Sequence, residues 1–294
     1  NPLKGAPYND YRFRQAVAYA IDRDQMVEQV LNGRGKVASS GGLANSSAWS
    51  ATGLPTYDDD AGHTKAKDLL AAVGFANTDG DPELELNGAD FNPNLYFGTV
   101  TFSQAPVDFI VQKLAAVGIK VNPVGEQQTP NSDQRAQTGN YEMVISAWAG
   151  HSADPDTLRQ RLAHSVTTNP DGTVRSAAFQ NVFGWNSSAS GPVVDDKGAQ
   201  TTRADWFNRL AGEQLVELDT EARLQKVQQM QELVAEDVPY VGLYIPDSLL
   251  YFRDRFTPWY FTPGATPHGP NTANNKQVFV TGRQFGSAVP GLGL

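Results

Sequence analysis

The chain has 294 residues, 40% of them hydrophobic, and a formal net charge of −9 at pH 7 from 23 Lys and Arg against 32 Asp and Glu. The 10% of aromatic residues excludes a disordered chain, and the shortage of clustered cations excludes a nucleic-acid-binding protein. The sequence has no cysteine, so a disulfide framework, thiolate metal sites and a cysteine nucleophile are excluded as well.

The N-terminal third predicts two helices separated by a long loop. Apolar side chains recur on one face over residues 12–31, which indicates one helix. Residues 35–55 are rich in Gly, Ser and Ala and predict an irregular loop, a kind of segment that often binds ligands. A second, short helix is expected over 63–73, with Gly74 at its C-terminal stop position.

The middle of the chain alternates strand and helix patterns. Strands over 83–87 and 95–101 are expected to form a hairpin. A helix over 105–117 then leads into a strand over 119–124, which predicts a βαβ crossover. The apolar run 141–148 is typical of a buried strand. Because ligands of open α/β sheets collect beyond the carboxyl ends of strands, the loop that follows this run is a candidate site.

The C-terminal part predicts two helices over 206–218 and 221–235 that pack as an antiparallel pair. A strand over 240–245 follows, with a further strand at 249–252. The remaining residues are rich in Pro, Gly, Asn and Thr, so we expect loop with one strand at 277–281.

Several sequence motifs resemble one protein family. The segment YNDYRFRQAVAYAIDRDQMV, residues 8–27, resembles the segment that opens the second lobe in family 5 of the extracellular solute-binding proteins, the oligopeptide, dipeptide and nickel type. Further landmarks are similar and follow in the family's order: a short helix over 65–75, the turn Asp79-Gly80-Asp81, a helix-to-strand step over 112–121, a loop with Trp148 and Asp154-Pro155-Asp156, and a closing helix and strand over 223–244. Their common order makes the resemblance specific.

The resemblance implies a fold and a domain organisation. Members of this family are about twice as long and consist of two α/β lobes joined by a hinge. The chain is thereby expected to be a fragment with the type II periplasmic-binding-protein fold, a mixed sheet flanked by helices. Residues 1–246 would form the second lobe, and residues 247–294 a tail that returns toward the first lobe.

The same resemblance implies a function. The chain would belong to the substrate-binding component of an ABC importer, which captures a peptide or other small polar solute between the lobes and delivers it to the permease subunits. The expected location is extracellular or periplasmic, with a lipid anchor or the permease as the only link to a membrane. We expect a monomer without cofactor, bound metal or nucleic-acid partner.

Trp148 and His151 are the first candidates for ligand binding. An indole at the end of a strand offers a flat apolar wall; on sequence alone core packing is the more common role of such a residue, whereas the family resemblance favours ligand contact. In peptide-binding relatives this Trp lies in the cleft, three residues before an Asp that pairs with the ligand's α-amino group. This chain has His151 there, and an imidazole cannot hold an ammonium as a carboxylate does, so a free peptide N-terminus is disfavoured. Asp154 is the alternative source of negative charge.

Three further residues complete the candidate ligand-binding set. Trp49 belongs to the long loop 35–55, and Asn181 and Trp185 belong to a second polar segment. For both tryptophans, ligand contact and core packing stay equally open. Asp156 is expected to cap the N-terminus of the helix that follows it.

No catalytic residues are expected. His151, Ser152 and Asp154 have the residue types of a hydrolytic triad, but the Gly-x-Ser-x-Gly elbow is absent from the sequence. A hydrolase using His151 and Asp154 remains one alternative, and a ligand-sensing or chaperone module on the same scaffold is another. The four histidines lack metal-ligand spacing, and Asp79-Gly80-Asp81 fits a turn better than a calcium loop.

Overall fold

The computed structural model describes residues 1–45, 47–99, 104–127, 135, 139–146, 154–163, 166–168, 174–176 and 183–247. For 166–168 and 174–176 this description is of the backbone alone. The strands expected at 249–252 and 277–281 lie outside these ranges. None of the described helices is both long enough and apolar enough to cross a membrane.

The first helical segment is two helices, so the prediction of one helix over 12–31 is wrong. After the short helix η1 (Pro2–Lys4), α1 (Tyr11–Ala20) and α2 (Arg23–Val30) are separated by Ile21, whose backbone is extended. The Asp22 carboxylate accepts a hydrogen bond from the backbone N–H of Gln25 at 2.8 Å. Asp22 therefore caps a new helix, and this cap interrupts a face whose apolar spacing alone looked continuous.

The helix expected over 63–73 is α3 (Thr64–Ala72), followed by Gly74 with φ +99°. Three short strands come next, β2 (Phe75–Ala76), β3 (Glu85–Leu86) and β4 (Ala89–Asp90), in one antiparallel sheet. The predicted hairpin between 83–87 and 95–101 is wrong, because β3 pairs with β2 and β4 instead. Asn87 and Gly88 both have positive φ, which gives the tight turn that folds β3 back onto β4.

The predicted βαβ crossover is confirmed. Strand β5 (Asn94–Gly98), helix α4 (Gln104–Ala115) and strand β6 (Asn122–Glu126) follow one another, and β5 lies between β6 and β7 (Met143–Ile145) in a parallel sheet. Ile119 and Val121 are buried, but they precede the strand ladder. Strand β6 therefore begins three residues later than predicted.

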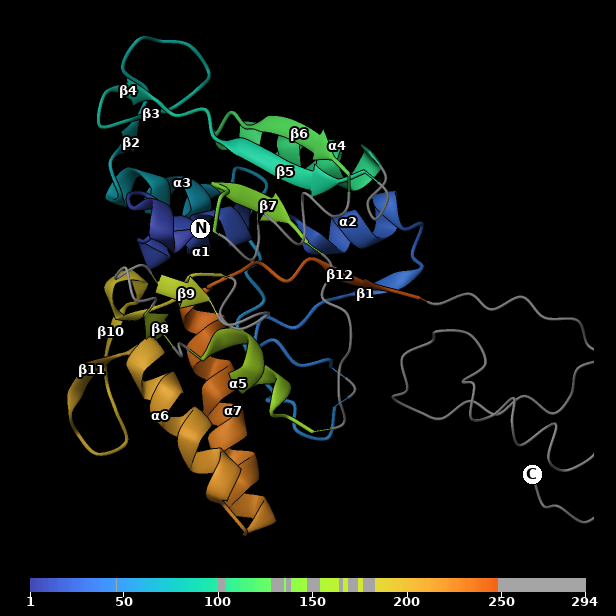
Figure 1. The fold of residues 1–294 in the computed structure, drawn as a ribbon. Helices are drawn as coiled ribbons and strands as arrows, with labels where there is room; N and C mark the ends of the chain where they lie inside the picture. The colour runs from blue at the N-terminus through green and yellow to red at the C-terminus, as the bar shows by residue number, and fades with distance from the viewer. Residues whose placement is uncertain are drawn as a thin grey trace, which may run out of the picture.

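The C-terminal part contains the expected helix pair, α6 (Arg203–Val216) and α7 (Thr220–Asp237), which lie side by side in Figure 1. Before this pair come α5 (Thr157–Leu162), β8 (Val166–Thr168), β9 (Val174–Ser176), η3 (Ser187–Ala189), β10 (Pro192–Val194) and β11 (Gln200–Thr202). After the pair, β12 (Tyr244–Pro246) pairs with β1 (Gly35–Val37). The strand expected over 240–245 is thus shifted toward the C-terminus.

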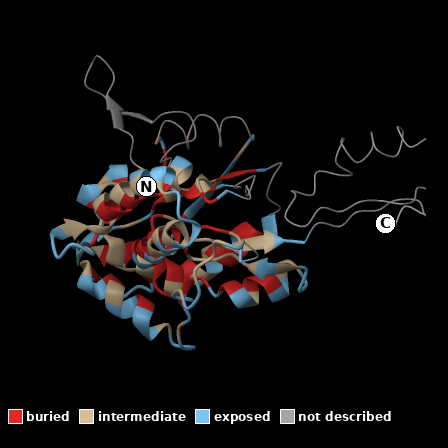
Figure 2. Cartoon of the chain, turned by 90° about the horizontal axis from the view of Figure 1, so that it is seen from below, coloured by how far each residue is buried: buried red, intermediate tan, exposed pale blue. Residues whose placement is uncertain are grey.

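Two large hydrophobic clusters stabilise the described part of the chain. The first joins α1, α3 and α4 to the parallel sheet, and the second joins α5, α6 and α7. Figure 2 shows the buried residues between the exposed outer faces of these elements. The α/β class is confirmed, with parallel and antiparallel pairing in separate small sheets. The division between 246 and 247 stays a prediction, because residues 248–294 lie outside the described ranges.

Candidate ligand-binding site

The carboxyl edge of the parallel sheet is the candidate site. Strands β5, β6 and β7 end at Gly98, Glu126 and Ile145, and all three run in the same direction. In this register Tyr96 lies between Val124 and Val144, and its side chain is half-buried. Trp148 and His151 lie outside the described residues, but they follow the end of β7 by only three and six positions. In chain order, both candidates therefore come shortly after the end of β7.

An ion pair and an aromatic ring lie on one face of this sheet, next to the end of β6. Arg135 donates from Nε to Glu126 Oε2 at 2.6 Å and from Nη2 to Oε1 at 2.5 Å. Its guanidinium carbon lies 3.8 Å from the centre of the Tyr96 ring. The hydrogen bonds from Arg135 hold the pKa of Glu126 below its usual value. These residues were missed by sequence reasoning, because one Arg nine positions after a Glu gives no signal until the end of β6 is known.

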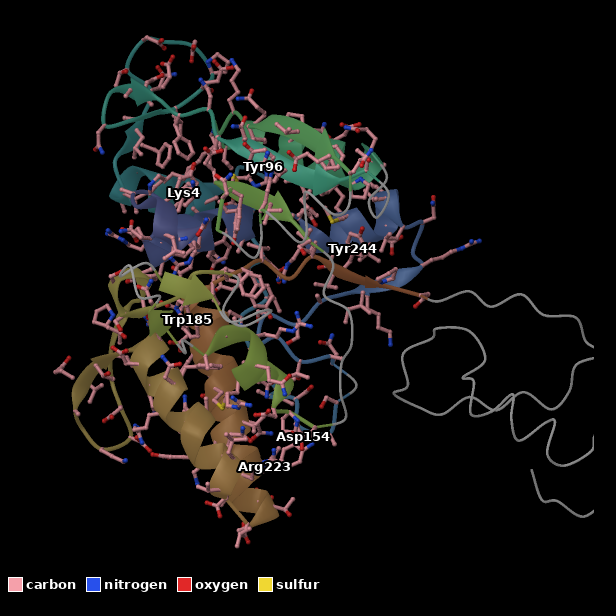
Figure 3. All side chains as sticks on the ribbon, in the orientation of Figure 1. Lys4, Tyr96, Asp154, Trp185, Arg223 and Tyr244 are labelled. Carbon is pink, nitrogen blue, oxygen red and sulfur yellow. The ribbon has the colours of Figure 1, made fainter. Side chains whose placement is uncertain are left out.

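Asp154 and Asp156 lie in another part of the molecule. Asp154 accepts hydrogen bonds from Arg223 Nη2 at 3.0 Å and from the backbone N–H of Asp156 at 2.9 Å. Figure 3 shows Asp154 and Arg223 together at the lower end of the molecule, far from Tyr96. The structure therefore does not bring Asp154 to the described sheet edge, and Arg223 already pairs with its carboxylate.

Asp156 occupies the N-cap position of α5, but its carboxylate does not cap the helix. It accepts hydrogen bonds from Arg159 Nε at 2.6 Å, from Gln160 at 2.9 Å and from Gln214 at 3.0 Å. Partial burial opposes ionisation, yet these donors keep the pKa of Asp156 below its usual value. The predicted capping bond is wrong, because the αR backbone of Asp156 (φ −59°, ψ −14°) differs from the extended backbone of a capping residue.

An open hollow of about 450 Å³ lies beside these two aspartates. Its lining combines carboxylates, one guanidinium and one leucine: Asp154, Asp156, Thr157, Gln160, Leu215, Glu217 and Arg223. Three of its carboxylates are paired with Arg223, Arg159 or Lys226. The Asp154–Arg223 pair and the hydrogen bond from Gln214 to Asp156 join the start of α5 to the helix pair, whereas the other two ion pairs are local.

Trp185 lies in the core. Its side chain is fully buried, its ring centre is 5.2 Å from that of Phe207, and its Nε1–H donates to the Asp237 carboxylate. Trp49 is half-buried against the second cluster, with the Arg223 guanidinium 5.1 Å from its ring centre. Of the two roles that the sequence left open, the structure favours packing for Trp185. The remaining candidate, Asn181, lies outside the described residues.

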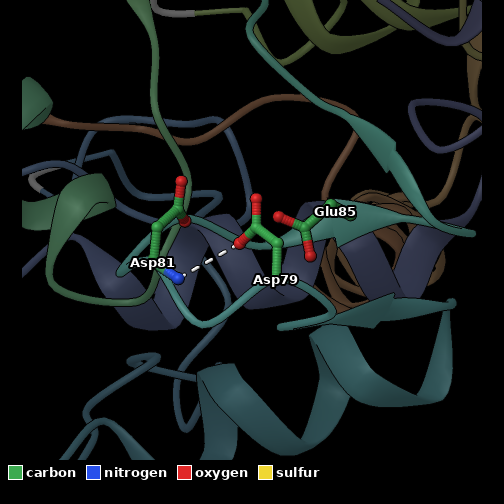
Figure 4. Close-up of side chains that lie close together, drawn as sticks. All are labelled: Asp79, Asp81 and Glu85. Carbon is green, nitrogen blue, oxygen red and sulfur yellow. Dashed lines mark hydrogen bonds between the residues drawn. The ribbon is translucent and has the colours of Figure 1, made fainter.

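The turn at Asp79-Gly80-Asp81 brings three carboxylates together (Figure 4). One oxygen each of Asp79, Asp81 and Glu85 lies within 4.8 Å of the others. Asp79 Oδ1 accepts from the backbone N–H of Asp81 at 3.1 Å, and Glu85 accepts from the Thr78 N–H at 2.6 Å and hydroxyl at 2.8 Å. These bonds organise the turn that the sequence predicts. Glu85 was missed, because its approach depends on the β2–β3 pairing.

Comparison with known proteins identifies the family. Residues 2–170 match the family described as bacterial extracellular solute-binding proteins, family 5, middle part. The chain belongs to this family. The family-5 chain is 28% identical over 180 residues to heme-binding protein A of Haemophilus influenzae, a match that covers 60% of this chain and 30% of that protein. It is 23% identical over 272 residues to the oligopeptide-binding protein AppA of Bacillus subtilis, with coverage of 88% and 43%.

Solved structures confirm the fold of the family-5 chain. The oligopeptide-binding protein of Thermus thermophilus, in complex with a pentapeptide, superposes with a TM-score of 0.64 at 24% identity. This match covers 83% of the family-5 chain and 39% of that protein, so the fold is that of the type II periplasmic binding proteins. The chain spans less than half the length of these relatives. Their names are those of binding proteins, which does not favour the hydrolase alternative.

Proposed function

We propose that the full-length protein is the substrate-binding component of an ABC importer and acts outside the cytoplasm. Residues 1–246 form one of its two lobes, and residues 247–294 return toward the other lobe. Membership of family 5 and the shared fold support this proposal. The observation that carries it is the parallel sheet, because its carboxyl edge is the side where α/β folds bind ligands.

Solute capture takes place between the lobes and ends with hinge closure. The loop after β7 supplies Trp148, which stacks on the solute, and His151, which gives a polar contact. Arg135 is held by Glu126 at the end of β6 and stacked on Tyr96 of β5. Since Glu126 already neutralises Arg135, this arginine does not require an anionic ligand.

The solute is a peptide or another small polar molecule that does not depend on a carboxylate at position 151. The relatives' names include heme and oligopeptides, so the scaffold accommodates chemically different ligands. The protein binds and releases its solute without turnover, works as a monomer and delivers the solute to permease subunits. It uses neither a cofactor nor nucleic acid, and it meets the membrane through the permease or a lipid anchor.

A thermal-shift screen of the full-length protein against peptides, oligosaccharides, heme and metal complexes tests the proposal, since selective binding to the folded state raises the melting temperature. At least one solute class is expected to raise it. Trp148→Ala should weaken binding of that solute tenfold or more, whereas Trp49→Ala should leave the affinity unchanged. A protein that binds none of these classes would contradict the proposed function, and unchanged affinity of Trp148→Ala would contradict the stacking role.

A further inference from the structure

Side chains from α1 and from Tyr57 bind the backbone carbonyls at the C-terminal end of α7. A helix leaves its last carbonyls without intrahelical partners, and Pro239 has no N–H to offer to Ala235. Four successive carbonyls accept from side chains instead: Ala235 from Tyr57 Oη, Glu236 from Gln15 Nε2 at 2.7 Å, Asp237 from Arg14 Nη2 at 2.8 Å, and Val238 from Arg14 Nε at 2.9 Å. The end of α7 is therefore fastened to α1.

Arg14 also reaches the segment that leads into α1. Its guanidinium donates to the Tyr8 carbonyl at 3.0 Å and to the Ala189 carbonyl at 2.7 Å. The Arg14 side chain is only 8% exposed, and the fully buried Asp237 carboxylate lies 3.6 Å from Nη2. A buried guanidinium needs such compensation and a full set of acceptors. One side chain thus joins the residues before α1, 5–10, to the end of α7 and the residues after it, 237–242; these are called the incoming and the outgoing segment below.

Arg23, on α2, fastens the outgoing segment further along. It donates to the carbonyls of Gly242 at 3.2 Å and Ala38 at 3.4 Å, and to that of Thr56. Figure 1 shows this segment leaving α7 in orange and running past α1 toward β12. Arg14 and Arg23 belong to the motif over residues 8–27 that carries the family resemblance. Both donate hydrogen bonds to carbonyls of the same segment, 237–242.

The backbone conformation of Val238 also indicates that contacts hold this segment in place. Val238 has φ +47°, in the left-handed region that β-branched residues rarely adopt. A strained conformation of this kind persists only where surrounding contacts enforce it. The Arg14 bond to the Val238 carbonyl is one of these contacts.

We infer that Arg14 and Arg23 are positioning residues for solute capture. Arg14 fixes the outgoing segment 237–242 to the incoming segment and to α1, and Arg23 fixes it to α2, so that both connections to the other lobe move as one rigid unit when the lobes close. This inference rests on the two-lobed binding protein proposed above. If the arginines served stability alone, any equally destabilising core change would have the same effect on binding.

The test uses the full-length protein with Arg14→Lys, which keeps the charge but loses the planar set of donors. Val227→Ala is the matched control, since Val227 is buried in the middle of α7 within the second cluster. Arg14→Lys is expected to weaken solute binding at least fivefold and to broaden the distance distribution between spin labels on the two lobes. Val227→Ala should leave both unchanged. Equal behaviour of the two folded variants would overturn the inference.

Hydrogen exchange separates this inference from the proposed function, because it needs no ligand. Arg14→Lys should raise the exchange rate of the amides at 240–245 at least tenfold, and Val227→Ala should not. A wild-type protein without any ligand would contradict the proposed function, whereas unchanged exchange at 240–245 would contradict the positioning role of Arg14. If Arg14→Lys does not fold, Arg23→Lys and Gln15→Ala take its place under the same criteria, since each removes fewer of these bonds.

Discussion

Replacing Trp185 by phenylalanine measures what the buried indole contributes to stability. The variant keeps an aromatic ring against Phe207 but loses the Nε1–H that donates to the Asp237 carboxylate. A hydrogen bond to a charged group contributes about 1.5–3 kcal/mol. The missing part of the indole leaves a gap that costs about 1 kcal/mol, a fraction of the roughly 3–5 kcal/mol for truncation to alanine. We therefore expect the free energy of unfolding to fall by about 3 kcal/mol.

Urea unfolding of the full-length protein, followed by circular dichroism, gives this difference. Trp49→Phe is the matched control, because Trp49 is half-buried and should cost about 1 kcal/mol or less. Trp185→Phe should bind solute with wild-type affinity once folded. A fall below about 0.5 kcal/mol would refute the stabilising role of the bond to Asp237. A change in affinity at wild-type stability would instead move Trp185 into the ligand site.

Three further predictions concern the sheet edge, a glycine and the helix-pair surface. Because Arg135 lowers the pKa of Glu126, the ion pair stabilises the folded state above the unfolded pKa of about 4.3 and loses this effect as the pH falls through the lower, folded pKa. The stability difference between wild type and Glu126→Gln, about 0.5–1 kcal/mol at pH 7, should therefore shrink in urea unfolding as the pH is lowered below the unfolded pKa. Gly118→Ala should lower the free energy of unfolding by about 2 kcal/mol or more in thermal unfolding, since φ is +83° and the new Cβ would lie 2.5 Å from Leu84 Cγ. The control Gly80→Ala has open space around its Cβ position and should lower the free energy of unfolding by only about 1 kcal/mol. Arg223→Ala should lose about 1 kcal/mol through the Asp154 pair and the Trp49 contact, and a loss that does not shrink in 1 M salt would contradict the electrostatic part.

Local signals predicted the helices better than the strand pairings. Gly74 and Gly118 mark helix ends by backbone conformations that other residues avoid, so the ends of α3 and α4 could be predicted closely. The break between α1 and α2 also has a signal in the sequence, the capping residue Asp22, but the continuous apolar face outweighed this single residue. The partner of a strand is a long-range property, and the nearest strand in sequence is only one of the candidates. For that reason β3 was paired with the wrong neighbour.

The candidate site could be predicted only in outline. The position of the site after β7 follows from the order of strands and helices, which periodicity reveals. The role of Trp185 does not follow, because a tryptophan in a polar segment packs equally well on a core or a ligand. Its partner Asp237 is 52 positions away, and an aspartate at a helix end normally stays exposed. Contacts of this range depend on how the segment around Trp185 packs against the end of α7, which no local pattern encodes.

The contacts of Arg14 also order the assembly of the lobe in time. Its acceptors at residues 237 and 238 lie 223 and 224 positions further along the chain, so they emerge from the ribosome long after α1. Until then the Arg14 guanidinium cannot be buried with its full set of acceptors, and α1 lacks its contacts with the end of α7. Contacts of such sequence separation form late and slow folding. The contacts at the C-terminal end of α7 are therefore completed only after residues 237 and 238 have been synthesised, however early α1 forms.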